Sequence, residues 1–224
     1  MVTCVAKNAN MCVRKNAIQE GDMRRSTYDR LEMVYQKFKG YIGTQELLKE
    51  GFSNRQIAVM AEEGHLEKVC HGYYWLAGKK EAKPSDYKCI EVCLSDPRAI
   101  VCMDSALYYQ GMLKEEPEYL SVATARTDRS LLGMAFPITR HYFSTNHYLI
   151  GARKKETEFG CYNIYDIERS ICDMLRLESY IDTEIVDKIK ANEEQYRRIL
   201  RYAEPLRVKQ QLYCLLYTSP SPRD

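Results

Sequence analysis

The chain has 224 residues, a mean hydropathy of −0.48, 29% charged residues and a formal net charge of +2. Its longest apolar runs are only a few residues long, so we expect neither a transmembrane helix nor a secretory signal. Its nine cysteines include no Cys-x-x-Cys pair. We therefore expect free thiols in a reducing cytosol rather than a disulfide framework.

The two ends of the chain lack the periodic hydrophobic pattern of the residues between them. Residues 1–22 show no sustained hydrophobic period, and residues 19–23 can be back-translated to a purine-rich run ahead of a start codon. We expect residues 1–22 to be a disordered upstream leader with translation starting at Met23; an intact mass that includes them would end this hypothesis. The tail 214–224, CLLYTSPSPRD, resembles a translated sequencing adaptor, and we expect it to be an artefact.

The remaining sequence divides by charge near residues 82–84. Residues 23–80 carry ten Lys and Arg against seven Asp and Glu, a net charge of +3, whereas residues 81–213 carry 19 against 21, a net charge of −2. Positive charge on the first segment favours nucleic-acid contact there. We expect two domains, residues 23–82 and residues 84–213.

The first domain has the pattern of a winged helix-turn-helix. Apolar residues at helical spacing predict a first helix that starts near Ser26 and ends at Gly40, and Thr44 can cap a short second helix. Gly51 makes the turn, and Ser53 starts a third helix with a Ser-x-x-Gln capping box. The wing is the predicted hairpin of residues 66–70 and 73–76, in which Tyr74 or Trp75 docks on the helices.

The third helix carries the predicted chemistry. Its inner face holds Ile57, Met60 and Ala61, and its N-terminus at Ser53 favours a phosphate. Recognition helices present their first residues to base edges, where Arg can bond guanine, Asn can bond adenine and small apolar side chains can touch a thymine methyl. The outward residues are Asn54, Arg55, Ala58, Val59 and Glu62. Expected phosphate contacts are Lys39, Lys68, His71, Lys79 and Lys80. The alternative is that these residues are ordinary surface groups of a protein–protein module.

The segment 40–76 resembles the N-terminal winged-helix domain of the AbiEi-type antitoxins of type IV toxin–antitoxin systems. The resemblance lies in a Gly-x-Ile-x-Thr-x-x-Leu start, a Ser-x-x-Gln-Ile helix and a His-Gly-x-Tyr wing. His71 stands where the family commonly shows Arg, which weakens the expected phosphate contact of the wing.

The second domain is expected to be α+β and to end in helices. Its residues 104–111 and 165–176 resemble two helices of the same family, the latter a Glu-Arg-Thr-x-x-Asp-x-x-Arg motif in which Ser170 replaces Thr. The charged residues of this motif are Glu168, Arg169, Asp173 and Arg176. They form either a charged site for antitoxin activity or an ion-pair network that fixes the helix.

Three weaker constellations do not predict catalysis. Cys89 and Cys93 are one helical turn apart, but further ligands at zinc spacing are missing, so buried free cysteines explain them better. The pair Asp104-Ser105 lacks the Gly-x-Ser-x-Gly context of a nucleophile, and Asp104 is expected to be a helix N-cap. The charged segment 153–158 is predicted to be a loop. We expect no enzyme activity, cofactor or metal.

Residues and resemblance together predict a cytoplasmic antitoxin that binds operator DNA and represses its own operon. It would counteract a nucleotidyltransferase-type toxin without needing a stable complex, and it would have no membrane partner. The alternative is a solitary winged-helix regulator whose second domain senses a ligand or partner, and an enzyme with a DNA-targeting domain is third. The first prediction depends on Asn54 and Arg55 pointing outward from the third helix.

Overall fold

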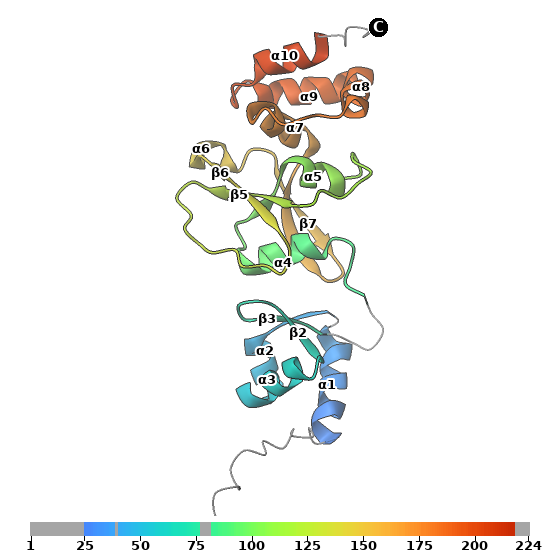
Figure 1. Ribbon diagram of the computed structural model, residues 1–224, viewed down its shortest axis with the longest axis vertical. Helices are drawn as coiled ribbons and strands as arrows, with labels where there is room; N and C mark the ends of the chain where they lie inside the picture. The colour runs from blue at the N-terminus through green and yellow to red at the C-terminus, as the bar shows by residue number, and fades with distance from the viewer. Residues whose placement is uncertain (1–24, 39, 77–81, 218–224) are drawn as a thin grey trace, which may run out of the picture.

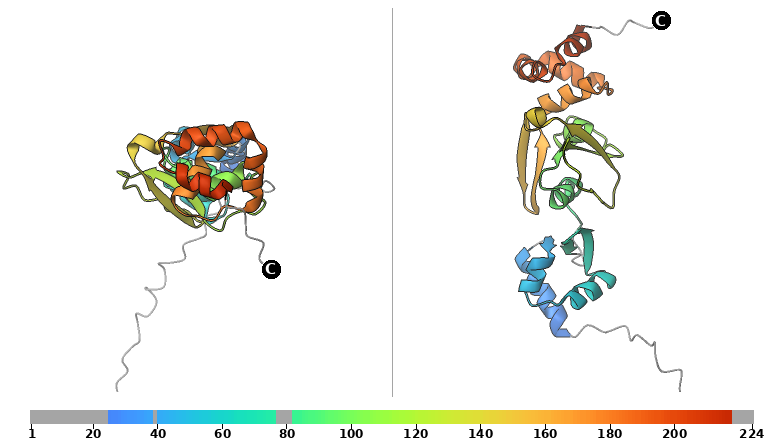
Figure 2. Two further views of the ribbon diagram at one scale, coloured as in Figure 1. Left: turned by 90° about the horizontal axis from the view of Figure 1, so that it is seen from above. Right: turned by 90° about the vertical axis from the view of Figure 1, so that its left-hand side faces the viewer.

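The computed structural model describes residues 25–38, 40–76 and 82–217 of the chain. Figure 1 shows them stacked along the long axis as helices with a small sheet, then a central sheet, then a layer of helices. Figure 2 shows the same order from the side. The fold is mixed α+β, as predicted, and none of the helices in these ranges is both long enough and apolar enough to span a bilayer.

Within residues 25–38 and 40–76, helices cover one face of a small antiparallel sheet. The elements in chain order are α1 (Arg25–Phe38), β1 (Tyr41–Gly43), α2 (Thr44–Lys49), α3 (Asn54–Glu62), β2 (Leu66–Cys70) and β3 (Tyr73–Leu76). The strand order is β1-β3-β2. The side chains of Val34, Leu47, Ile57, Met60 and Leu66 form the core of this first part.

The start of α2 differs from the prediction that Thr44 caps it. Gly43 is the N-cap residue, and its amide donates to the Glu46 carboxylate over 2.7 Å. The Thr44 hydroxyl instead donates to the carbonyl oxygen of Gly72 over 3.2 Å. Thr44 therefore ties the start of α2 to the turn of the hairpin.

The two aromatic residues of β3 lie on opposite faces of the hairpin because side chains alternate along a strand. Tyr74 packs against the core beneath the helices. Trp75 is 3% exposed and packs with Val69, Cys70 and, in the second part, Phe159. Tyr74 is thus the residue that docks on the helices, and Trp75 joins the hairpin to the second part.

Residues 82–217 form the second part around a mixed sheet. Its elements are α4 (Tyr87–Ser95), β4 (Ile100–Val101), α5 (Met103–Tyr109), β5 (Leu120–Ala125), β6 (Ile138–Phe143), α6 (Thr145–Tyr148), β7 (Ala152–Thr157), β8 (Gly160–Tyr165), α7 (Ile167–Arg176), α8 (Thr183–Ala191), α9 (Glu193–Ala203) and α10 (Lys209–Tyr217). The strand order is β6-β5-β4-β8-β7, with β4/β8 and β5/β6 parallel.

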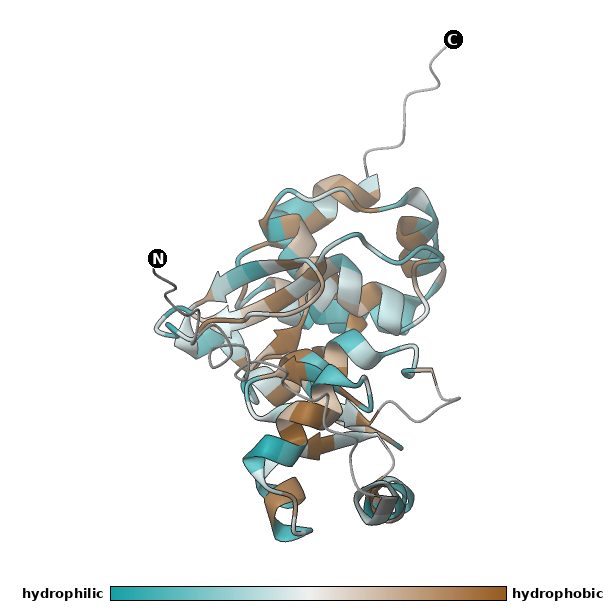
Figure 3. Cartoon of the chain, turned by 60° about the horizontal axis from the view of Figure 1, so that its bottom comes forward, coloured by the Kyte–Doolittle hydropathy of each residue, from teal (hydrophilic) through white to brown (hydrophobic). Residues whose placement is uncertain are grey.

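The central sheet has a buried core on each face. Val101 faces the core that α4 covers, while its neighbour Ile100 faces the core shared with α5 and the C-terminal helices. Figure 3 shows hydrophilic and hydrophobic residues side by side along the helices, as amphipathic helices that cover a core require. Both faces of the sheet are therefore covered.

The prediction of a loop over residues 153–158 of the second part is wrong. The segment 153–158 is not a loop, because residues up to Thr157 form β7, an edge strand that pairs with β8. Its exposed charged side chains hide the apolar alternation of a strand and protect the sheet edge. At the C-terminal end, α10 runs past Cys214 to Tyr217, and Leu215 and Leu216 pack against the core.

Candidate nucleic-acid interface

The N-terminal end of α3 is exposed, and the backbone amides of Ser53 and Gln56 have side-chain hydrogen-bond partners. The Gln56 amide donates to Ser53 Oγ over 3.3 Å, and the Ser53 amide donates to the Gln56 side chain over 2.9 Å, which confirms the predicted capping box. Asn54, Arg55 and Ala58 are exposed. These three side chains are therefore available to a partner at the front end of the helix.

The C-terminal end of α3 is fixed against α1. The Tyr28 hydroxyl donates to Glu63 Oε2 over 2.9 Å, and the ring of Tyr28 lies edge-on to His65 with 5.0 Å between centroids. Val59 was expected to point outward but is half-buried, since it packs against the core of the first part. Val59 therefore does not belong to the outward face of α3.

The turn before α3 is anchored by Arg30 on α1. Its Nη1 donates to the carbonyl oxygen of Gly51 over 2.9 Å, and its guanidinium lies 5.2 Å from the ring centroid of Phe52. Gly51 has φ +85°, a conformation that favours glycine. These contacts hold the turn that sets the angle between α2 and α3.

The hairpin presents two further predicted contacts. Lys68 on β2 and His71 at the turn are exposed. Both line a cleft of about 630 Å³ between the hairpin and the start of α2, together with Lys49. Lys39 and Lys79-Lys80, also predicted to contact phosphates, lie outside the described residues.

The opposite face of the hairpin is fixed to the second part through a buried carboxylate. Glu91 on α4 is 2% exposed, and its Oε1 lies 2.7 Å from Lys83 Nζ. The same Lys83 Nζ lies 2.7 Å from Glu67 on β2, and the Tyr41 hydroxyl donates to Glu91 over 3.1 Å. Burial and the Glu91 carboxylate raise the pKa of Tyr41, which stays protonated as this donor. This contact between the two parts was not predicted; the single tryptophan of the chain, Trp75, next to the core residue Tyr74 in the same strand, is the feature of the sequence that could have indicated it.

The charged motif on α7 is mostly buried. Arg169 and Asp173 are 0% exposed, and Arg169 Nε donates to Asp173 Oδ2 over 2.8 Å. Arg169 Nη1 also donates to the carbonyl oxygens of His147 and Ile150, each over 2.6 Å, and the guanidinium lies 4.3 Å from the Tyr165 ring centroid. Burial raises the pKa of Asp173 to about 6 against the opposing effect of Arg169. This pair joins α7 to the segment before β7.

The other two residues of the motif do not join that pair. Glu168 is 7% exposed and its Oε1 accepts from Arg198 Nε on α9 over 2.8 Å. Arg176 is exposed at the end of α7, and its guanidinium lies 6.0 Å from the Phe143 ring centroid. Because Arg169, Asp173 and Glu168 are engaged inside the fold, their geometry is that of an ion-pair network.

The weaker constellations are also engaged in the fold. Ser105 is 1% exposed, and its Oγ donates to the carbonyl oxygen of Tyr119 over 3.3 Å. Asp104 lies inside the first turn of α5, whose N-cap residue is Cys102, so the prediction that Asp104 is the N-cap is wrong. Burial raises the pKa of the Cys89 and Cys93 thiols, and no group of three or more metal-ligating side chains occurs in the part of the chain that the structure describes.

The architecture defines a mixed α+β protein in which an exposed helix end and a hairpin lie on one part and a two-faced sheet forms the other. No family model matches the chain, and no curated protein matches it. Among solved structures, the fold is similar to that of the RV2827C protein from Mycobacterium tuberculosis, with a TM-score of 0.51 at 12% sequence identity. The similarity covers 92% of this chain and 86% of that chain. At this identity the likeness concerns the fold alone.

Proposed function

We propose that residues 25–76 are a winged helix that binds DNA, and that the protein is a cytoplasmic antitoxin that represses its own operon. The observation that carries the DNA-binding proposal is the exposed front end of α3, where Asn54, Arg55 and Ala58 are free of the core. Their side-chain types match donors and apolar groups that read base edges in the major groove. The antitoxin assignment is supported by the sequence resemblance of both parts to the AbiEi type.

The arrangement around α3 allows the helix to enter a groove by its N-terminus. The helix start and Ser53 favour a phosphate, whereas Glu62 and Glu63 at the other end repel one. Lys68 and His71 are exposed on the hairpin and can contact the backbone of the same duplex. Such contacts release counterions, so affinity falls steeply as salt rises.

Substitution of Arg55 tests the DNA-binding proposal most directly. Arg55→Ala removes a bidentate donor to guanine, so we expect a loss of about 1–3 kcal/mol on the DNA upstream of the coding region and a relaxed base preference at one position. Quantitative gel retardation at several salt concentrations measures both effects. Arg126→Ala is the matched control, because Arg126 is exposed on the second part and carries the same charge.

Two outcomes would contradict this assignment. An equal loss on random DNA would make Arg55 a phosphate contact rather than a base contact. No retardation at low salt with the wild-type protein would exclude DNA binding by α3 altogether. The antitoxin assignment is tested separately: where the adjoining reading frame encodes a nucleotidyltransferase-type toxin, co-expression of the two proteins is expected to relieve the growth defect that the toxin causes alone.

The alternative proposal is a solitary regulator whose second part senses a ligand or a partner. A groove of about 650 Å³ in the second part favours it. The next reading frame distinguishes the two functions, since a nucleotidyltransferase gene that adjoins this one supports the antitoxin. Its absence supports the solitary regulator.

A further inference from the structure

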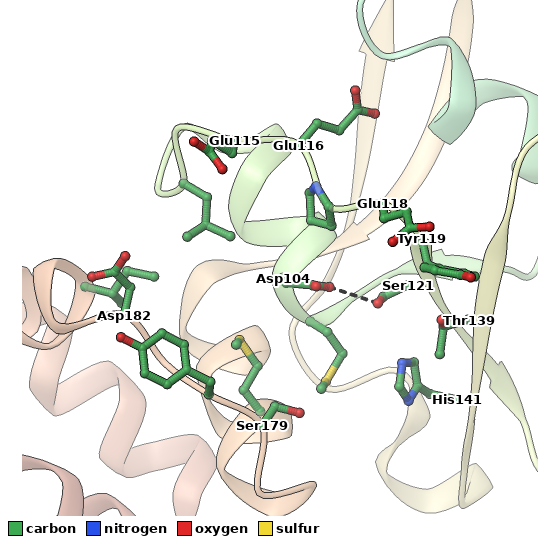
Figure 4. Close-up of a pocket in the computed structure, with 16 residues that line it drawn as sticks. Asp104, Glu115, Glu116, Glu118, Tyr119, Ser121, Thr139, His141, Ser179 and Asp182 are labelled. Atoms are coloured by element: carbon green, nitrogen blue, oxygen red, sulfur yellow. Dashed lines mark hydrogen bonds between the residues drawn. The ribbon is translucent and has the colours of Figure 1, made fainter.

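A groove with an apolar floor opens between the central sheet and the C-terminal helices (Figure 4). Its volume is about 650 Å³, and its floor is formed by Met103 on α5, Met174 on α7 and Ile185 on α8. The side chains of these three residues are buried. The groove lies entirely within residues 103–185 and shares no residue with α3 or the hairpin.

One wall of the groove holds an oriented carboxylate. Asp104 accepts hydrogen bonds from the Ser121 hydroxyl over 2.9 Å and from the Ser105 amide over 2.8 Å, both at Oδ1. Asp104 is half-buried and lines the groove. Figure 4 shows Asp104 and His141 on the same side of the groove. Burial lowers the pKa of His141, so its ring is neutral at pH 7 and adds no positive charge.

The rim of the groove is acidic and aromatic. Glu115 and Glu118 are exposed on the loop between α5 and β5, and Asp182 stands at the start of α8. The nearby Lys114 is ion-paired with Glu184 over 2.9 Å, which compensates its charge. The exposed rings of Tyr119 and Tyr180, at 48% and 79%, flank the same opening.

These features specify the chemistry of the occupant. A long basic side chain lays an apolar stem on an apolar surface and extends its charged head to carboxylates. A guanidinium in addition bonds a carboxylate with two donors and stacks on aromatic rings. Tyrosine and arginine are both enriched at protein interfaces. We propose that this groove binds an arginine side chain presented by a segment of a partner protein.

This proposal is independent of DNA binding and is tested by NMR on the full chain with methyl-labelled methionine. The probe is the peptide acetyl-Gly-Gly-Arg-Gly-Gly-amide. We expect a saturable shift of the Met103 and Met174 methyl signals, whereas Met33, 65% exposed on α1, stays in place. The same peptide with citrulline, the neutral analogue of arginine, is expected to leave both groove methyls unshifted.

Variants of the carboxylates locate the binding. Glu118→Gln removes an exposed rim charge without affecting the core, and combination with Asp104→Asn is expected to weaken the peptide about tenfold. Glu204→Gln, an exposed substitution outside the groove lining, is the matched control and is expected to leave affinity unchanged. Gel retardation with the double variant is expected to equal that of the wild type, so failure of either proposal is recognised separately.

Three results would overturn the assignment. The first is an equal shift of Met33 and the groove methyls, which would indicate diffuse surface binding. The second is equal binding of the citrulline peptide, which would remove the role of charge. The third is tighter binding of spermidine than of the arginine peptide, which would assign the groove to a small polyamine rather than to a protein segment.

Discussion

Helices α3 and α7 each carry an arginine next to other polar residues, but the two side chains differ in exposure. Arg55 on α3 is exposed, whereas Arg169 on α7 is 0% exposed and bonded to Asp173 and to two backbone carbonyl oxygens. The helices differ in what surrounds them: α3 lies at the surface of the first part, and α7 lies between the sheet and the C-terminal helices. An arginine in the first setting is available for recognition, and one in the second serves stability.

The largest effect that tests this contrast is expected from Arg169→Met. The substitution keeps a long side chain but leaves Asp173 without its cation and the His147 and Ile150 carbonyl oxygens without their donor. Breaking a buried pair from one side costs about 3–5 kcal/mol of the free energy of unfolding. Urea unfolding measures it, and Arg55→Ala is the control that stays within about 0.5 kcal/mol. A similar loss of unfolding free energy in both variants would contradict the different roles of Arg55 and Arg169.

A smaller effect is expected in the pH dependence of stability. Burial raises the pKa of Asp173 from its ordinary 3.8 to about 6, so between these values the folded state binds more protons than the unfolded state. The contribution of Asp173 is therefore present at low pH and is lost as pH rises through about 6, by at most about 3 kcal/mol. In Asp173→Asn this pH dependence is absent. Urea unfolding of both proteins at about pH 4.5 and about pH 7.5 measures the difference, and equal pH profiles would contradict it.

The predicted helix starts were right for α3 but wrong for α2 and α5, whose N-cap residues are Gly43 and Cys102. Ser53 was predicted to start a helix and caps α3 in the structure, because its capping box with Gln56 is a local interaction. The strand at residues 152–157 was missed, since its exposed charges follow from its place at the sheet edge rather than from its own sequence.

The candidate sites show the same limit. The outward direction of Asn54 and Arg55 follows from the helical period, but the half-burial of Val59 depends on how far the core extends around α3. The groove floor joins Met103, Met174 and Ile185 from three helices. The spacing of these residues in the sequence does not predict that they lie together, because their proximity results from the packing of the three helices. The helical period therefore predicts which residues share one face of a helix, whereas the burial of that face depends on tertiary packing.

The smallest effect on stability is expected at the start of α3, where the N-cap Ser53 precedes the exposed Arg55. Ser53→Ala removes the acceptor of the Gln56 amide and one half of the capping box, at a cost of about 1 kcal/mol. Ser53→Asp keeps an acceptor and adds negative charge at the helix N-terminus, so it is expected to retain stability but to weaken DNA binding by phosphate repulsion. Urea unfolding and gel retardation of both variants separate the two roles. If the aspartate variant bound DNA as tightly as the wild type, the front end of α3 would not meet a phosphate, and the duplex would have to approach by another face.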